Sequence, residues 1–257
     1  FGSSPCSMTQ KVAQSRTSYV PAMQEDEETD TVQRDSQGLR LAGDETKTES
    51  QERSSYFKLL SLCFLIGQAF AWGAYFAIRG IWPEQKRLMD QKFANLYEQQ
   101  LGWLYVAWAI LFYTRMYLMV NTNGARAEAR VDRPDQHVYK VMAQTGELSS
   151  EAAPYVMMAN TGPVGRFNRA QRAAYNMDES LSLYCLASML AGYVFGPLVA
   201  FILLVYAMGR IHFANNYKKA ANARGNGFLL SMVGEQLVYG LAILCGIKAI
   251  AGPAITF

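Results

Sequence analysis

Residues 167–179 read FNRAQRAAYNMDE, a polar and charged stretch that opens onto a long apolar run. On an α-helix with about 3.6 residues per turn, Arg172, Asn176 and Glu179 follow one another at i, i+4 and i+7 and therefore share one face. Charged side chains at the mouth of a membrane-spanning helix are costly, so they mark a candidate functional site. Arg172 and Asn176 could supply the cation and the hydrogen-bond donors that the Glu179 carboxylate needs in a low-dielectric setting, or the three could hold neighbouring helices together.

A second group of candidate site residues lies in residues 209–225, which read GRIHFANNYKKAANARG. Arg210 and Tyr217 are seven residues apart on one predicted helix face, and Arg224 follows Tyr217 at the same interval. Guanidinium groups bind carboxylates through two parallel hydrogen bonds, and a guanidinium near a thiol favours the reactive thiolate. We therefore expect an anionic ligand with carboxylates here, with Tyr217 as a hydroxyl donor.

Five apolar segments must position these residues. A membrane-spanning helix needs about 20 mostly apolar residues, because the hydrocarbon core is about 30 Å thick and each helical residue rises about 1.5 Å. Pro83 and Pro197 mark the end of the first span and the start of the fourth, since proline is poorly tolerated inside a helix. Helices of a soluble domain would carry polar stripes, and these segments have almost none. The chain is predicted to be an all-α integral membrane protein with spans at residues 56–83, 101–120, 166–194, 197–221 and 227–250.

Basic residues indicate which side of the membrane a loop faces. Lys and Arg gather in residues 121–165 and again around Lys218, Lys219 and Arg224, and the five spans place both regions on one side. Lys218 and Lys219 are interpreted as the ordinary basic flank of a span. We expect this side, together with the N-terminal arm, to face the cytosol, stroma or matrix. The membrane would be an endomembrane or that of an organelle, with the plastid and mitochondrion as candidates, because residues 1–20 are Ser/Thr-rich and free of acid, as in a transit sequence.

The remaining segments divide the chain further. Residues 1–55 are polar, and a segment with so few apolar groups is expected to be disordered unless a partner binds it. Residues 84–100 are expected to form a loop, and residues 121–165 a long one. Loops longer than about 12–15 residues are usually functional or have structure of their own. The first span, at 56–83, is separate from a four-helix bundle over 101–257.

Composition argues against several other kinds of site. The four cysteines include no CxxC pair, and the two histidines have no cysteine or HExxH neighbour, so neither a metal site nor a disulfide framework is expected. A net charge of +3 without a basic patch interleaved with aromatic residues argues against nucleic acid as a partner. No paired repeat or discontinuous helix pair indicates a transporter.

The two stretches at residues 167–179 and 209–225 together resemble the MAPEG family, the membrane-associated proteins in eicosanoid and glutathione metabolism. That family includes microsomal glutathione transferases and leukotriene C4 synthase. Its RAxxNxxE pattern is matched from Arg172 to Glu179, and its later Arg-x-x-aromatic-x-x-x-Tyr pattern is matched from Arg210 to Tyr217. The resemblance covers residues 100 to 250, roughly, which include four of the five spans.

The resemblance implies a four-helix bundle that assembles as a homotrimer, with glutathione bound between neighbouring subunits on the basic side. Glutathione would be a co-substrate, either conjugated to a lipophilic electrophile or used to reduce a lipid hydroperoxide. Arg224 would be the catalytic residue, because it would stabilise the thiolate. No metal would be needed, and the glutathione-binding residues would be Arg172, Asn176, Glu179, Arg210 and Tyr217.

The chain also departs from the family pattern. Many members carry a proline soon after the glutamate at the position of Glu179, and this chain does not. Phe213 stands where some members have a tyrosine, and Asn216 replaces a frequent glycine. The arm, the first span and the long loop are additions, of the kind a bundle acquires when it joins a larger assembly.

Two functions from different classes therefore stay open. One is a membrane-embedded glutathione transferase or peroxidase, which the retained motif residues favour. The other is a non-catalytic accessory subunit of a respiratory or photosynthetic membrane complex, whose other subunits would bind the N-terminal arm. We favour the enzyme, because both motifs occur in the expected order and on the same side of the membrane; its electrophilic substrate stays open.

Overall fold

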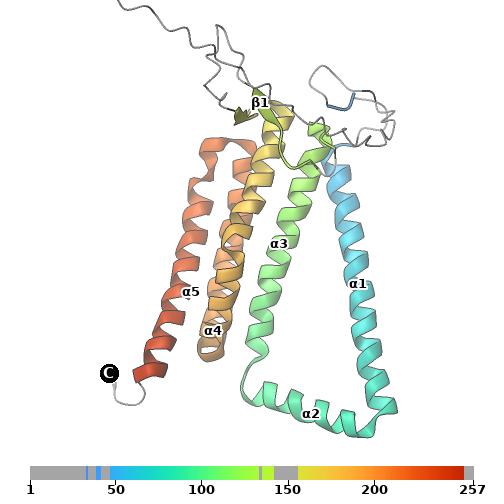
Figure 1. Cartoon of the computed structure of the whole chain (residues 1–257), viewed down its shortest axis with the longest axis vertical. Coiled ribbons are helices and arrows are strands. Elements are labelled where there is room, and N and C mark those ends of the chain that lie inside the picture. The colour runs from blue at the N-terminus through green and yellow to red at the C-terminus, as the bar shows by residue number, and fades with distance from the viewer. Residues whose placement is uncertain (1–32, 34–38, 42–46, 133–134, 142–155, 252–257) are drawn as a thin grey trace, which may run out of the picture. The chain divides into compact units, whose positions relative to one another are not determined.

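The computed structural model describes residues 33, 39–41, 47–132, 135–141 and 156–251. Within these residues the chain forms five α-helices, one short 3-10 helix and a two-stranded antiparallel sheet (Figure 1). The elements in chain order are α1 (Glu49–Ile81), α2 (Pro83–Glu98), α3 (Gly102–Ala129), β1 (Tyr139–Val141), β2 (Val156–Met158), α4 (Gly162–Lys219), η1 (Ala221–Arg224) and α5 (Gly225–Ala251).

The longest element, α4, is a helical hairpin. Phe195 has non-helical backbone angles (φ −115°, ψ 38°) and lies just before Pro197, which has no N–H to donate to the preceding turn. The ring centroids of Tyr184 and Tyr206, on opposite sides of Phe195, are only 4.5 Å apart. The helix therefore reverses at Phe195, and it supplies a first limb before that residue and a second limb after it.

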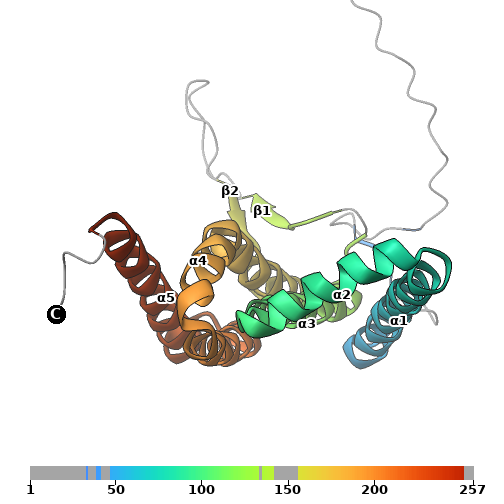
Figure 2. The same ribbon diagram turned by 90° about the horizontal axis from the view of Figure 1, so that it is seen from below.

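The core of the bundle lies between α3, the two limbs of α4, and α5. Figure 2 shows these helices in order across the bundle, with α1 beside α3 and apart from α5. Large side chains from all four parts are buried at the centre: Leu111, Leu118, Met177, Tyr184, Leu203, Tyr206 and Val238.

The backbones of the second limb and α5 lie close together at two glycines. A Cβ atom at Gly209 would lie 2.6 Å from the backbone nitrogen of Ser231, and one at Gly227 would collide with the backbone nitrogen of Phe213. Any larger residue would force the two backbones apart. Small residues at helix contacts are typical of membrane bundles, where helices associate through close packing.

Among the described residues, four helices are long and apolar enough to cross a membrane: α1, α3, α4 and α5. Because α4 folds back at Phe195, they provide five crossings, as predicted. Large apolar side chains lie exposed on the outer faces, among them Phe70, Tyr193, Phe201 and Ile243. Such side chains fit a lipid environment, so the predicted all-α membrane bundle is confirmed.

Residues 84–98 belong to helix α2, so the prediction of a loop over residues 84–100 is wrong for most of that segment. Pro83 is the first residue of α2, where its missing N–H costs nothing. Arg87 and Glu84 pair across one turn at 2.7 Å. The helix lies across the ends of α1 and α3 and joins them (Figure 1).

The long loop predicted over residues 121–165 is shorter in the structure, because α3 and α4 both extend into it. Asn168 on α4 fixes the strand region between them. Its amide oxygen accepts from the backbone nitrogen of Val138 at 3.1 Å, and its Nδ2 donates to the carbonyl oxygens of Val138 and Ala159, both at 2.8 Å. The connection is therefore attached to the first limb of α4.

Most of the predicted N-terminal arm, residues 1–55, lies outside the described residues. Of the part that is described, Leu39 is buried in a small apolar cluster that includes Phe167 of α4. Next to it, Arg40 pairs with Asp132 at 2.6 Å. The chain itself therefore holds this part of the arm.

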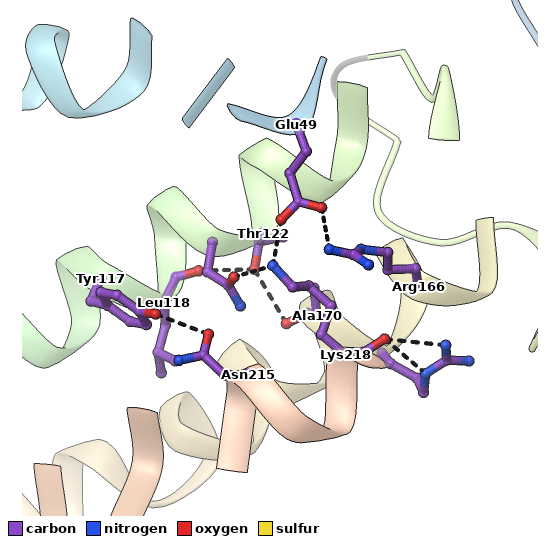
Figure 3. A network of polar contacts seen from close by, with 10 residues as sticks. Glu49, Tyr117, Leu118, Thr122, Arg166, Ala170, Asn215 and Lys218 are labelled. Atoms are coloured by element: carbon purple, nitrogen blue, oxygen red, sulfur yellow. Dashed lines mark hydrogen bonds and ion pairs between the residues drawn. The ribbon is translucent and has the colours of Figure 1, made fainter. Parts of the chain in front are cut away.

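A buried ionic network joins the start of α1 to the bundle (Figure 3). Lys218 Nζ donates to Glu49 Oε1 at 2.5 Å and to Asn121 Oδ1 at 2.6 Å. Arg166 Nη2 lies 2.7 Å from the other carboxylate oxygen of Glu49. The interpretation of Lys218 as an ordinary basic flank is wrong, because this residue is 4% exposed and its ammonium is paired with a buried carboxylate, whereas Lys219 is exposed.

Candidate functional site

Arg210 lies at the centre of a buried polar cluster between the two limbs of α4 and α5. Its Nη1 donates to Asn176 Oδ1 at 2.5 Å, and its Nη2 lies 3.4 Å from Glu235 Oε2. The guanidinium carbon is 5.1 Å from the centroid of the Tyr206 ring. Two of the predicted binding residues, Asn176 and Arg210, therefore bind each other inside the bundle.

Glu235 on α5 is a member of this cluster that the sequence analysis does not identify. Its Oε1 accepts from the Tyr239 hydroxyl at 2.9 Å, and its side chain is largely buried beside Arg210. The sequence does indicate Glu235 in one way, because it is a single acidic residue inside an apolar span. A charge in such a span is costly unless a partner compensates it. Arg210 and Glu235 supply that compensation to each other.

Arg172 and Glu179 lie on the outward face of the first limb. Arg172 Nη1 is 2.7 Å from Glu179 Oε1, and the two side chains are 44% and 54% exposed. Their spacing predicts a shared helix face with Asn176, but in the structure Asn176 bonds inward to Arg210, whereas the side chains of Arg172 and Glu179 stay accessible from outside the chain.

Tyr217 and Arg224 form a third group where the second limb ends. The short helix η1 brings the Arg224 guanidinium to 5.7 Å from the centroid of the Tyr217 ring, a cation–π distance. Tyr217 also stacks on Phe213, with centroids 5.4 Å apart and planes 18° apart. Phe213 therefore serves as an apolar base under the tyrosine, and Arg224 stays exposed.

The hairpin brings these three groups to the same end of the bundle, because its two limbs are antiparallel. A single chain still leaves them separate. Across the part of the chain that the structure describes, no hydrogen bond or ion pair connects Arg224 with Arg172 or Glu179.

The family model of the MAPEG family matches residues 101–245, more than half of the chain. The chain belongs to the MAPEG family. The matched segment starts where α3 begins and ends inside α5, so it contains every predicted site residue and also Glu235. It leaves out α1 and α2. A search of curated proteins finds no match.

The connection between α3 and α4 adds an imidazole to the outward face of this MAPEG bundle. The His137 ring lies 5.5 Å from that of Tyr175 on the first limb, centroid to centroid. Its Nε2 is buried without a hydrogen-bond partner in the described chain. Burial, and then the guanidinium of Arg172, lower the pKa of His137 below its usual value, because both disfavour the imidazolium. The surroundings of His137 therefore favour its neutral form, and the sequence analysis does not identify this residue.

Proposed function

We propose that this MAPEG protein binds glutathione and uses its thiolate on lipophilic electrophiles or lipid hydroperoxides. The observation that carries the proposal is a set of polar side chains at one end of the bundle: the accessible Arg172, Glu179 and Arg224 and the half-buried Tyr217. Charged groups on a membrane bundle are costly unless a polar ligand or a partner chain satisfies them. Glutathione offers two carboxylates, an amine and a thiol, which match these groups.

In this proposal each group has its own role. Arg172 donates to a carboxylate of glutathione, and Glu179 accepts from its amine, so both exchange their mutual ion pair for the ligand. Tyr217 donates its hydroxyl to the peptide. Asn176 and Arg210 are already bonded to each other, and they fix the helix face that presents the outward residues.

Arg224 is the proposed catalytic residue, because a guanidinium next to the thiol favours the thiolate. In conjugation, the thiolate sulfur forms a bond to an electrophilic carbon, and the displaced group leaves with the bonding electrons. In reduction of a lipid hydroperoxide, the thiolate sulfur forms a bond to the terminal oxygen as the O–O bond breaks, which gives glutathione sulfenic acid. The lipid alkoxide leaves and takes up a proton to become the alcohol. A second glutathione then converts the sulfenic acid to the disulfide and releases water.

A homotrimer would complete the site. In one chain, the accessible pair of Arg172 and Glu179 is separate from the half-buried Tyr217 and its exposed neighbour Arg224. A neighbouring copy that places one pair opposite the other would enclose glutathione between two subunits. We place this end of the bundle, with its basic loops, on the cytosolic, stromal or matrix side of the membrane.

An accessory role in a larger membrane complex is the second candidate. It is favoured by α1, which lies outside the family match and exposes aromatic side chains along its length: Phe57, Phe70, Trp72 and Phe76. In that case these side chains and the arm would contact other subunits, and the arginines would only hold helices together.

Turnover distinguishes the two candidates. The purified chain in liposomes would be supplied with glutathione and either a halonitrobenzene or a lipid hydroperoxide, and the conjugate or the glutathione disulfide would be quantified. We expect activity in the native protein and at least a 10-fold loss in Arg224→Ala. Lys219→Ala is the matched control, since it removes an exposed positive charge at the same end of the bundle. Absence of turnover in the native protein would contradict the enzyme and favour the accessory role.

A further inference from the structure

A groove with mostly apolar walls lies between α1 and α3. It encloses about 740 Å³, which is within the ~300–1,000 Å³ of ligand pockets. Its walls are apolar for most of their length, with Leu60, Phe64 and Leu65 from α1 and Phe112 and Met116 from α3. Because α1 lies outside the family match, the groove is a feature of this chain and does not depend on the glutathione site.

One end of the groove is polar. Ser50, Arg53 and Ser54 line it at the start of α1, next to the network that attaches Glu49 to Lys218. In the described part of the chain, no carboxylate pairs with the Arg53 guanidinium. This end corresponds to the membrane surface, since the predicted span of α1 begins just after it.

The side chain of Arg53 packs against α3 at Gly124. A Cβ atom at Gly124 would collide with the Cγ atom of Arg53, so only glycine lets the arginine stem lie across α3 there. The backbone of α3 thus accommodates a positive charge at the mouth of an apolar groove. A guanidinium in this place, without a carboxylate partner among the described residues, fits a phosphate, which it can bind through two parallel hydrogen bonds.

We propose that the groove binds an anionic phospholipid, with one acyl chain between α1 and α3 and its phosphate at Arg53. The polarity of the groove matches that of the lipid, because its one charged lining residue, Arg53, lies at the membrane surface and the rest of the lining is mostly apolar. A helix from a partner protein fits less well, since a helix with side chains is about 10 Å wide. Inside the groove, the centroid of the Phe64 ring lies 6.2 Å from that of Phe112 and 6.1 Å from that of Tyr113. These contacts join α1 to α3 and leave too little space for a helix between them.

Native mass spectrometry of the full chain in detergent tests this directly. Phosphatidylglycerol and phosphatidylcholine with identical acyl chains would be titrated separately, and the lipid-bound fraction would be measured. Arg53→Gln keeps part of the stem and removes the charge, and Ser61→Trp fills the groove, of which Ser61 is a lining residue. Lys58→Gln is the matched control, since Lys58 is exposed on α1, does not line the groove and faces about 140° away from Arg53.

We expect phosphatidylglycerol to bind the native chain at least 10-fold more tightly than phosphatidylcholine. Arg53→Gln should remove that preference, Ser61→Trp should weaken both lipids, and Lys58→Gln should change neither. Equal binding of the two lipids to the native chain, or equal effects of Arg53→Gln and Lys58→Gln, would overturn the proposal. So would a Ser61→Trp chain of native helicity that keeps its lipid and instead loses an oligomeric contact, because the groove would then be an interface between copies.

Discussion

The guanidinium of Arg210 and the carboxylate of Glu235 face each other inside the bundle, 3.4 Å apart, with side chains only 4% and 13% exposed. The two residues come from different helices, the second limb of α4 and α5. Breaking a buried ion pair by removing one partner is strongly destabilising, because the other charge stays buried without compensation. This pair therefore connects the candidate site to the stability of the bundle.

We expect Glu235→Ala to lower the free energy of unfolding by about 3 kcal/mol, the lower end of the range for a broken buried pair. Thermal unfolding in detergent, followed by circular dichroism, measures the change. Glu84→Gln on α2 is the control, because its pair with Arg87 is exposed and should contribute less than about 1 kcal/mol. A Glu235→Ala chain as stable as the control would contradict this account of the cluster.

The ionic network at the start of α1 predicts which of two substitutions destabilises the protein more. Glu49 is shared by Lys218 and Arg166, so Glu49→Ala leaves two cations without their carboxylate, whereas Lys218→Met leaves Glu49 with Arg166. We expect Glu49→Ala to cost about 3 kcal/mol of stability and Lys218→Met to cost less. The double variant should be less destabilised than the sum of the two, as expected for residues in contact. The reverse order of the single variants would show that the network does not hold α1 in this way.

We expect alanine to have opposite effects on stability at two glycines, one packed against a neighbouring helix and one with open space around it. Gly209→Ala places a methyl group against the backbone of α5 and should cost about 1–3 kcal/mol, as overpacking does. A Cβ atom at Gly67 on α1 would meet no other part of the described chain within 4 Å, so Gly67→Ala should stabilise the helix by up to about 1 kcal/mol. Unfolding temperatures of both variants check this. If the two alanines had the same effect, the second limb and α5 would not meet at Gly209.

His137 predicts a pH dependence. Burial and Arg172 lower its pKa, whereas in the unfolded chain it titrates near the usual value of about 6.5. As the pH falls through that value, the unfolded chain binds the proton first, so the stability present above it decreases until the folded imidazole also titrates. Arg172→Gln should raise the pKa of His137 and weaken this dependence, as measured by an NMR titration of the imidazole. Lys219→Gln should leave that pKa where it is; equal shifts in both variants would rule out a specific effect of Arg172.

Much of the fold can be predicted from the sequence, because five apolar runs of bilayer length leave few alternatives. The reversal at Phe195 follows from Pro197. Helix α2 is harder to predict, since its polar composition resembles a loop; only Pro83 at its start and the spacing of Glu84 and Arg87 indicate a helix.

The site could be predicted only where its residues lie close together in the sequence. The helix face of Arg172, Asn176 and Glu179 follows from spacing alone. The pairing of Arg210 with Glu235, and the burial of Lys218 by Glu49, depend on helices that meet only in the folded bundle. A lysine at the end of a span looks the same in the sequence whether it faces water or a buried carboxylate.

Glutathione binding to the detergent-purified chain, measured by calorimetry, tests the central claim most directly. The account predicts micromolar to millimolar affinity in the native chain and in Lys219→Ala. In Arg224→Ala it predicts binding at least 10-fold weaker, a loss of about 1.4 kcal/mol or more. No heat with the native chain would contradict the claim, and equal binding by the native chain and Arg224→Ala would remove Arg224 from the site.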